Sequence, residues 1–441
     1  MLERKIEKTL SKYYKDPSAP IMIVDGARQV GKTYIIRQTA SKYFKNYIEI
    51  NLQNDFENTK SFDKVRSVET FEIILTSLYG ANKLGNINNT IIFLDEIQVY
   101  PHLITLLKPL KQQNKYRFIA SGSLLGITLK HIFIPMGSIQ EVNLYPLDFE
   151  EFLWATKKVG KNVIEYLKKC FIKKESVTDA LHPIMMEYFK KYLLTGGLPD
   201  AVLRFVDNLN ITEMRNIQSE IIQQYKADAA KYDSTNNLKI GRIYDLMPSY
   251  MKNKVKRVKV KDIEENKKAE FKNYIDEFDY LINSGVALAT YAISNPSSFP
   301  LLQSMSKNLV KLYFNDVGLL TNILYKNNVN AVLYNQDNNI NSGSVYETVV
   351  ATELKAHGHE LYYFDSKKIG EVNFLINDYD SLKILPIEIK SGKDSSNFKA
   401  LPKLISIDSK VINKGYVFYN ENEIKEQNNI FYFPIYLIMF L

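Results

Sequence analysis

The sequence lacks several features that would assign it to a familiar class. It has one cysteine, Cys170, among 441 residues, so no disulfide framework can form within the chain. No apolar run is long enough to span a bilayer, and the first residues, MLERKIEKTLSKYY, contain no apolar signal core. These absences argue against a disulfide-stapled secreted domain and against a helical membrane protein. We expect a protein of a reducing, cytoplasmic compartment with no membrane partner.

The bulk composition is that of an ordinary globular protein, with 45% hydrophobic and 24% charged residues. At about 150 residues per domain, the length predicts roughly two to four domains. The net charge of +8 attracts phosphate-rich partners over long range, but it does not identify one.

The first 150 residues alternate between apolar runs and helical patterns. This alternation predicts an α/β fold with a parallel sheet and helices on both faces. After residue 152 the pattern becomes mostly helical up to about 290, and 327–344 is a polar stretch typical of a loop. Strand patterns return from about 345, and the final run, IFYFPIYLIMFL, indicates a buried strand. The early strands are expected at 21–24, 47–52, 90–94 and 116–120, and the early helices at 1–18, 32–44 and 67–80.

The sequence GARQVGKT at 26–33 fits the P-loop (Walker A) pattern G-x-x-x-x-G-K-[ST] and stands between an expected strand and an expected helix. Glycines let the backbone curl so that its N–H groups face phosphates, and the helix N-terminus adds its dipole. Lys32 is expected to reach the β- and γ-phosphates, and Thr33 to offer its hydroxyl to Mg²⁺. A plain glycine turn would not explain Lys32 and Thr33 together. We predict that ATP or ADP binds at Gly26, Ala27, Arg28, Gln29, Val30, Gly31, Lys32, Thr33 and Tyr34.

A second motif places two carboxylates, Asp95 and Glu96, at the end of the apolar run IIFL. The carboxyl ends of parallel strands are where open α/β sheets bind ligands. Asp95 is therefore predicted to hold Mg²⁺ with Thr33, and Glu96 to polarise the attacking water. The alternative is a solvated acidic turn.

Ser121 ends the next expected strand, FIASGS, where a polar side chain can contact the γ-phosphate or orient the attacking water. The alternative is a small residue that serves the turn alone. No arginine finger can be assigned, because the spacing of Arg28 and Arg37 is not diagnostic.

Several motifs together resemble the predicted AAA+ superfamily ATPases of bacteria and archaea that carry a C-terminal domain of unknown function. The motifs span residues 26 to 393 and are GARQVGKT, IIFLDEIQ, FIASGSLLG, LYPLDFEEFL, TGGLPDAV, KLYFNDVGLL and EVNFLI…PIEIKSGK. The resemblance implies an AAA-type ATPase domain at 1–155, a mainly helical, winged-helix-like region at 156–325, and an α/β domain with a restriction-endonuclease-like fold at 326–441. Members are generally of unknown cellular role.

The expected winged-helix-like region suggests a DNA contact. Helical patterns at 238–285 precede an apolar run at 286–293 that would form a wing-like hairpin. The run KNKVKRVKVK at 252–261 carries six basic residues in ten, which could release counterions from a phosphate backbone. The alternative is a solvated linker.

The C-terminal part contains a nuclease-like set of residues that departs from the family pattern. Endonucleases of the restriction type use a helix acid, an Asp at a strand end, and Glu-x-Lys on the next strand to hold Mg²⁺ and activate water. Here Glu347 matches the helix acid, and Glu388 and Lys390 share one strand face. The Asp position is Asn373, a neutral side chain that ligates hard cations poorly. Glu371 lies two residues away and could substitute. We therefore expect a catalytically degenerate domain.

These observations lead to an ATPase that uses ATP and Mg²⁺ to switch or drive an interaction with a macromolecule. DNA and protein both stay open as partners, and so does oligomerisation. The alternatives are an ATP-dependent DNA nuclease and an ATP-gated protein-interaction scaffold.

Overall fold

The computed structural model describes residues 2–123, 125–128, 137–208, 210–232, 237–252, 258–264, 270–334, 342–392 and 399–441. The chain forms two compact units. The first comprises Glu3–Tyr145 together with Asn283–Gly285, and the second comprises Pro146–Ile282 and Val286–Leu441 with the first two residues. Within the described ranges, no helix combines the length and the apolar character needed to cross a bilayer.

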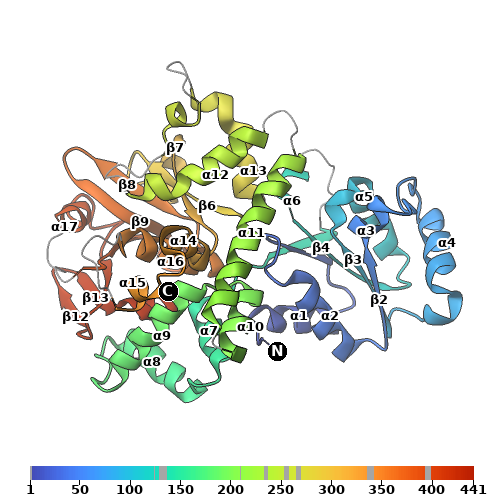
Figure 1. The fold of residues 1–441 in the computed structure, drawn as a ribbon, viewed down its shortest axis with the longest axis horizontal. Coiled ribbons are helices and arrows are strands. Elements are labelled where there is room, and N and C mark those ends of the chain that lie inside the picture. Colours follow the sequence, from blue (N-terminus) through green and yellow to red (C-terminus); the bar gives the residue numbers. More distant parts are fainter. Residues whose placement is uncertain are drawn as a thin grey trace. The chain divides into compact units, whose positions relative to one another are not determined.

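The first unit is built on a sheet of five parallel strands in the order β2-β3-β4-β1-β5 (Figure 1). Parallel neighbours need crossover connections, and helices supply most of them. The strands are β1 (Ile21–Asp25), β2 (Asn46–Asn51), β3 (Thr90–Asp95), β4 (Arg117–Gly122) and β5 (Ile139–Asn143). The helices are α1 (Ile6–Lys15), α2 (Lys32–Tyr43), α3 (Leu52–Glu57), α4 (Val68–Tyr79), α5 (Pro101–Gln112) and α6 (Leu125–Thr128), with the short 3-10 helices η1 (Ala81–Lys83) and η2 (Ile97–Val99).

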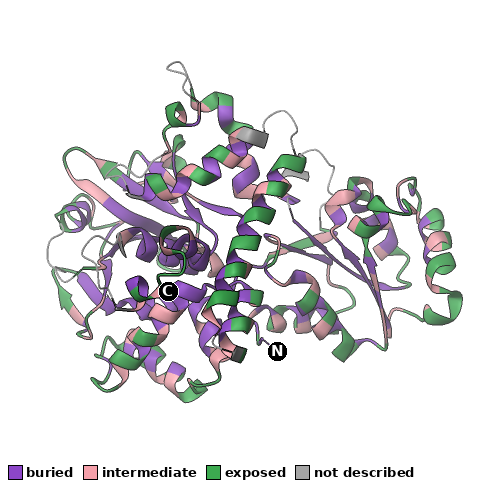
Figure 2. Cartoon of the chain, viewed as in Figure 1, coloured by how far each residue is buried: buried purple, intermediate pink, exposed green. Residues whose placement is uncertain are grey.

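The central strands of this sheet are buried along their whole length (Figure 2). In β3, all six residues from Thr90 to Asp95 are buried, which explains why this run is almost continuously apolar. One face packs Ile92 and Leu94 against α5, whose Leu103 and Leu107 belong to the same apolar cluster. The ends of these central strands are therefore held in place by a packed apolar core.

Helix α1 is fastened to the sheet by Arg117 at the start of β4. The Arg117 guanidinium donates to the carbonyls of Tyr13, at 2.7 Å, and Asp16, at 2.6 Å. It also lies 4.9 Å from the centre of the Tyr13 ring. These bonds tie the last turn of α1 and the residue after it to the first residue of β4.

The second unit contains most of the helices and a larger mixed sheet. Helix α7 begins with a capping box, in which Asp148 accepts from the Glu151 amide at 2.9 Å. The helices are α7 (Phe149–Thr156), α8 (Lys161–Lys173), α9 (Leu181–Thr195), α10 (Pro199–Asn208), α11 (Ile211–Tyr232), α12 (Asn237–Lys252), α13 (Ile275–Asn283), α14 (Val317–Tyr325), α15 (Val329–Tyr334), α16 (Ser342–Ala356) and α17 (Ala400–Ile405), and the 3-10 helices are η4 (Val260–Asp262), η5 (Phe271–Tyr274), η6 (Leu301–Ser304) and η7 (Ile435–Phe440).

The larger sheet has eight strands in the order β12-β13-β11-β10-β9-β8-β6-β7, with both parallel and antiparallel pairs. One face packs against α17, where Leu401 and Leu404 join Val372 and Val417 in an apolar cluster. Helix α16 contacts β6, β7 and β10. The strands are β6 (Ala287–Ile293), β7 (Met305–Phe314), β8 (Tyr362–Ser366), β9 (Gly370–Asp378), β10 (Lys383–Ile389), β11 (Gly415–Tyr419), β12 (Lys425–Gln427) and β13 (Ile430–Pro434).

The α/β prediction and the parallel N-terminal sheet are confirmed. Two local expectations were wrong. The polar stretch 327–344 contains the short helix α15, and the final apolar run is a strand only as far as Pro434 and then continues as η7. Proline cannot donate to a sheet ladder, so a strand is apt to end there.

The hairpin expected at 286–293 exists as β6 and β7, but β6 also pairs in parallel with β8. The hairpin is therefore an edge of the eight-stranded sheet, which it shares with the C-terminal strands. The boundaries proposed at residues 155 and 325 stay predictions.

Candidate functional site

The loop that follows β1 has the backbone shape of a phosphate cradle. Gly26, Gln29 and Gly31 have φ values of 152°, 67° and 91°. A Cβ atom at Gly26 would lie 2.2 Å from the carbonyl oxygen of Leu144, so only glycine fits there. Arg4 supports the loop from outside, because its guanidinium donates to the Val30 carbonyl at 3.1 Å.

Lys32 begins α2 and turns its ammonium back into the loop. Its Nζ donates to the carbonyls of Gly26 and Ala27, both at 2.8 Å. An ammonium has three N–H donors, and these two carbonyls use two of them. Burial lowers the pKa of Lys32, while the carboxylates of Glu96, Asp25 and Asp95 oppose that shift. The charge is thus held inside the curl of the loop.

Asp95, at the end of β3, contacts one side chain at the start of α2 and one on the neighbouring strand β4. It accepts a hydrogen bond from the Thr33 hydroxyl at 2.9 Å and another from the Ser121 hydroxyl. Strand β4 lies between β1 and β3, with Val24 opposite Ser121 and Leu94 opposite Ala120. Strand order therefore brings together the three predicted residues Thr33, Asp95 and Ser121.

Glu96 directly follows β3 in the left-handed region, with φ 57°. Its Oε2 accepts from the Gln98 side-chain amide at 2.5 Å and from the Ser123 hydroxyl at 3.2 Å. Gln98 also contacts Ser123 itself, at 3.2 Å between Nε2 and Oγ. The carboxylate of Glu96 is therefore held in one position beside Asp95.

Asp25 is a further buried carboxyl at the end of β1. Burial raises its pKa to about 6, and Glu141 on β5 adds to the shift. Its Oδ1 has no hydrogen-bond partner among the described residues. A buried, unpaired acceptor next to a phosphate-binding loop is costly unless a ligand or a water satisfies it.

The other predicted nucleotide-binding residues are less enclosed. Tyr34 is 50% exposed, and Arg28 is partly exposed. Arg37 is held by Glu49 on β2, with 2.6 Å between Nη2 and Oε1. Arg37 is therefore paired at the surface and does not point to a role at the loop.

The nuclease-like residues also come together, on α16, within β9 and at the end of β10. The Asn373 amide donates to Glu347 Oε1 at 3.0 Å, and its carbonyl oxygen accepts from the Ile389 amide at 3.0 Å. Lys390 lies 3.3 Å from Glu388. Burial raises the pKa of Glu388 to about 7, and Lys390 opposes the shift.

The orientation of the Asn373 side chain is fixed by its surroundings. The Ile389 N–H needs an acceptor, so the amide oxygen faces it and the NH₂ group faces Glu347. The substitute considered for this position, Glu371, forms an ion pair with the buried Lys311 at 2.6 Å. No group of three His, Cys, Asp or Glu side chains able to hold a metal occurs in the part of the chain that the structure describes.

Residues 253–257 of the basic run at 252–261 lie outside the described residues. Of the lysines in the run, Lys252 is the last residue of α12, and Lys259 and Lys261 are exposed.

Three family models match successive parts of the chain. Residues 18–153 match the family model of the AAA domain. The chain carries an AAA domain. Residues 186–330 match a domain of unknown function (DUF8612), and residues 342–438 match a second domain of unknown function (DUF4143). The AAA domain is the part that contains the loop, Asp95 and Ser121, and it supports an ATP-binding ATPase.

The proteins that are similar over longer parts of the chain have low sequence identity to it. An uncharacterized protein of Methanocaldococcus jannaschii is 24% identical over 418 residues, which covers 91% of this chain and 82% of that protein. The Walker-type ATPase of Pyrococcus abyssi is 14% identical, with a TM-score of 0.44, over 73% of this chain and 95% of that one. The RuvB Holliday junction branch migration motor of Thermotoga maritima is 12% identical, with a TM-score of 0.29, over 65% of this chain and 89% of that one.

Four residues around the AAA-domain loop were not predicted from the sequence motifs. They are Arg4, Asp25, Gln98 and Ser123. Asp25, Gln98 and Ser123 stand in or beside the motifs DGARQVGKT, IIFLDEIQ and FIASGS. Their nearness to these motifs could therefore have indicated that they belong to the site. Arg4 had no such signal, because it reaches the loop only through the folding of α1.

Proposed function

We propose that this protein hydrolyses ATP with Mg²⁺ at its AAA domain and that turnover changes its interaction with a macromolecule. The observation that carries the proposal is the pair of hydrogen bonds from Thr33 and Ser121 to Asp95, with Glu96 next in the chain. The Thr33 hydroxyl at the start of α2 and the Asp95 carboxylate at the end of β3 are oxygen ligands of the kind that Mg²⁺ prefers. When bound, Mg²⁺ would neutralise charge on the phosphates.

Each residue of the site has a separate task in this proposal. The loop amides and Lys32 bind the phosphates, since the amides of a glycine-rich turn and a helix N-terminus both favour anions. Thr33 and Asp95 hold the metal, while Ser121 keeps the Asp95 carboxylate in place. Glu96 orients the attacking water, and Gln98 and Ser123 keep its carboxylate turned toward the site.

The assignment is tested by two substitutions with different expected results. Lys32→Ala should lose nucleotide binding, measured by calorimetry with ATP and Mg²⁺. Glu96→Gln should bind ATP as the unaltered chain does and lose turnover by about 10²-fold or more, because the water is no longer oriented. Normal ATP binding by Lys32→Ala would show that the site is assigned wrongly.

DNA is the macromolecule that we propose to test first. The net charge of +8 and the exposed Lys259 and Lys261 favour a polyanionic partner. ATP turnover should rise when duplex DNA is added, and binding should weaken steeply with salt. Replacing Lys259 and Lys261 with Gln should weaken binding, whereas replacing the exposed Lys64 and Lys83 of the first unit should not.

If duplex DNA neither raises ATP turnover nor binds to the chain, a protein partner becomes the better explanation.

We infer that the C-terminal domain does not cut DNA, because Asn373 gives Glu347 a hydrogen-bond donor in place of a second carboxylate. Plasmid cleavage in Mg²⁺ that survives Lys32→Ala but disappears in Glu388→Ala would overturn this inference.

A further inference from the structure

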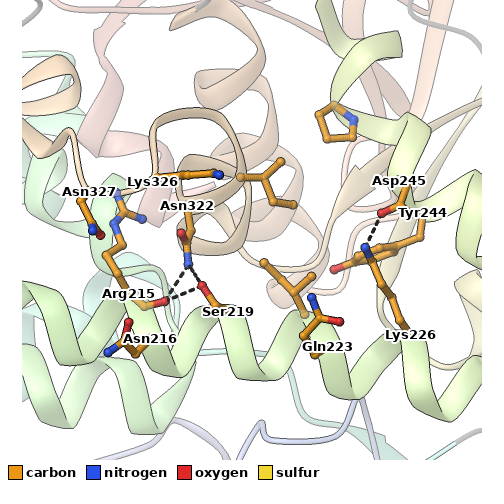
Figure 3. A pocket seen from close by; sticks show the side chains of 13 residues that line it. Arg215, Asn216, Ser219, Gln223, Lys226, Tyr244, Asp245, Asn322, Lys326 and Asn327 are labelled. Carbon is orange, nitrogen blue, oxygen red and sulfur yellow. Dashed lines mark hydrogen bonds and ion pairs between the residues drawn. The ribbon is translucent and has the colours of Figure 1, made fainter.

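A cavity of about 450 Å³ lies in the second unit, between α11, α12 and α14 (Figure 3). The proposed ATPase does not use it. Figure 3 shows Arg215, Asn322 and Lys326 at one end of the cavity and Lys226, Tyr244 and Asp245 at the other. Small-molecule sites typically measure about 300–1,000 Å³, so the cavity is large enough for a metabolite-sized ligand.

The unusual member of the lining is Arg215, which is only 1% exposed. Its Nη1 atom contacts the Gln218 side chain at 3.0 Å and the Thr321 hydroxyl at 3.1 Å. Its Nε and Nη2 atoms have no hydrogen-bond partner among the described residues. A buried guanidinium with two unsatisfied donors is costly, and those two donors form the edge that binds a carboxylate or a phosphate in a bidentate manner.

No carboxylate in the described ranges forms an ion pair with Arg215. Burial lowers the pKa of Arg215 to about 10, and the charge of Asp316 opposes this shift through space. The Asp316 oxygens are already used, because they accept from the amides of Gly197, at 2.6 Å, and Leu319, at 3.1 Å. The positive charge of Arg215 is therefore only partly compensated.

The rest of the lining has an excess of positive charge. Lys226 is neutralised by Asp245, at 2.5 Å. Lys326 is exposed at the end of α14 and has no acidic partner among the described residues. Two cations, Arg215 and Lys326, thus remain at one end of the cavity (Figure 3). At the other end, the buried Tyr244 hydroxyl has no hydrogen-bond partner among the described residues.

We propose that this cavity binds a small organic phosphate monoester. The phosphate lies between Arg215 and Lys326, and the organic part extends along α11 toward the hydroxyl of Tyr244. A phosphate carries a charge of about −1.5 to −2 at pH 7, which matches two cations better than a single carboxylate does. The cavity is much larger than a phosphate ion, so the ligand has an organic part.

The test uses the full chain with Lys32→Ala, so that the nucleotide site does not take up the probe. Phenyl phosphate and inorganic phosphate are titrated by calorimetry at constant ionic strength, with acetate as the carboxylate probe. We expect saturable 1:1 binding of phenyl phosphate that is tighter than that of inorganic phosphate or acetate. Adding Lys326→Ala should weaken binding by about five- to tenfold, the value of one charge-assisted contact.

The matched control is Lys231→Ala, an exposed lysine on the same helix α11 that does not line the cavity. It should leave the affinity unchanged. Arg215→Lys should also weaken binding, since an ammonium cannot offer the two-donor edge. No saturable binding, or equal affinity in the Lys326→Ala and Lys231→Ala chains, would overturn the proposed site. A phenyl phosphate affinity no better than that of inorganic phosphate would overturn the organic part of the ligand.

Discussion

The side-chain amide of Asn373 on β9 donates a hydrogen bond to the carboxylate of Glu347 on α16, across 3.0 Å. Two carboxylates at this distance would repel each other unless a cation lay between them. The amide removes that need, because it supplies a donor of its own. The pair therefore stabilises the contact between helix and sheet without a metal.

Replacing Asn373 with an aspartate should make the stability of the C-terminal domain depend on divalent cations. Asn373→Asp places a buried acid next to Glu347 and near Glu388, so we expect the free energy of unfolding to fall by about 2–4 kcal/mol. Mn²⁺ or Mg²⁺ should recover part of this loss, as measured by denaturant unfolding. The matched control is Asn377→Asp, which is buried on the same strand and keeps an acceptor for the Leu301 amide. Equal stability of Asn373→Asp and the unaltered chain without metal would contradict the prediction.

Glu388 should give the protein a measurable pH dependence. Its pKa is about 7 in the folded chain against a usual value of 4.5, so the folded state favours the protonated acid. This contribution to stability is fully present below pH 4.5 and is lost as the pH rises through 7. Between pH 5 and pH 8, the unaltered chain should lose about 2–3 kcal/mol relative to Glu388→Gln. Unfolding curves of the unaltered chain and of Glu388→Gln at the two pH values test this prediction. The same difference in unfolding free energy between the two chains at both pH values would rule it out.

Gln98 is expected to act through Glu96, as a positioning residue. Gln98→Ala removes the hydrogen bond to Oε2 and leaves only Ser123 on the carboxylate. The kcat for ATP should fall by about tenfold while KM changes little, because phosphate binding does not involve this contact. Gln53→Ala removes a similar amide–carboxylate bond on the exposed surface, to Glu57, and should change neither constant. A parallel rise in KM would point to a structural role instead.

Gly26 is predicted to be irreplaceable for steric reasons. Gly26→Ala would bring a Cβ atom within 2.2 Å of the Leu144 carbonyl oxygen, whereas Gly80→Ala meets nothing within 4 Å. Both glycines have positive φ, so the comparison separates the clash from backbone strain. ATP binding should be lost in Gly26→Ala and kept in Gly80→Ala, with a stability loss of about 1–2 kcal/mol in the latter. Retained binding by Gly26→Ala would mean that the loop can move away from Leu144.

Local sequence patterns predicted the main features of the AAA domain. The P-loop, the buried run before Asp95 and the strand that contains Ser121 could all be predicted, because glycine freedom, apolar runs and helix signals act within a few residues. The same reasoning failed for α15 and for the end of the chain after Pro434. Those segments are shaped by burial against distant elements, which outweighs local propensity.

Only the tertiary structure decided which distant groups meet. Thr33 and Ser121 reach the same carboxylate because β4 lies between β1 and β3. The hydrophobic periodicity of a strand does not predict the order of the strands in the sheet. The ion pair of Lys311 with Glu371 and the unsatisfied edge of Arg215 likewise depend on how helices and strands pack. The sequence alone determined the residue types and their local backbone conformation. The burial of apolar faces that are distant in sequence determined which side chains lie next to one another.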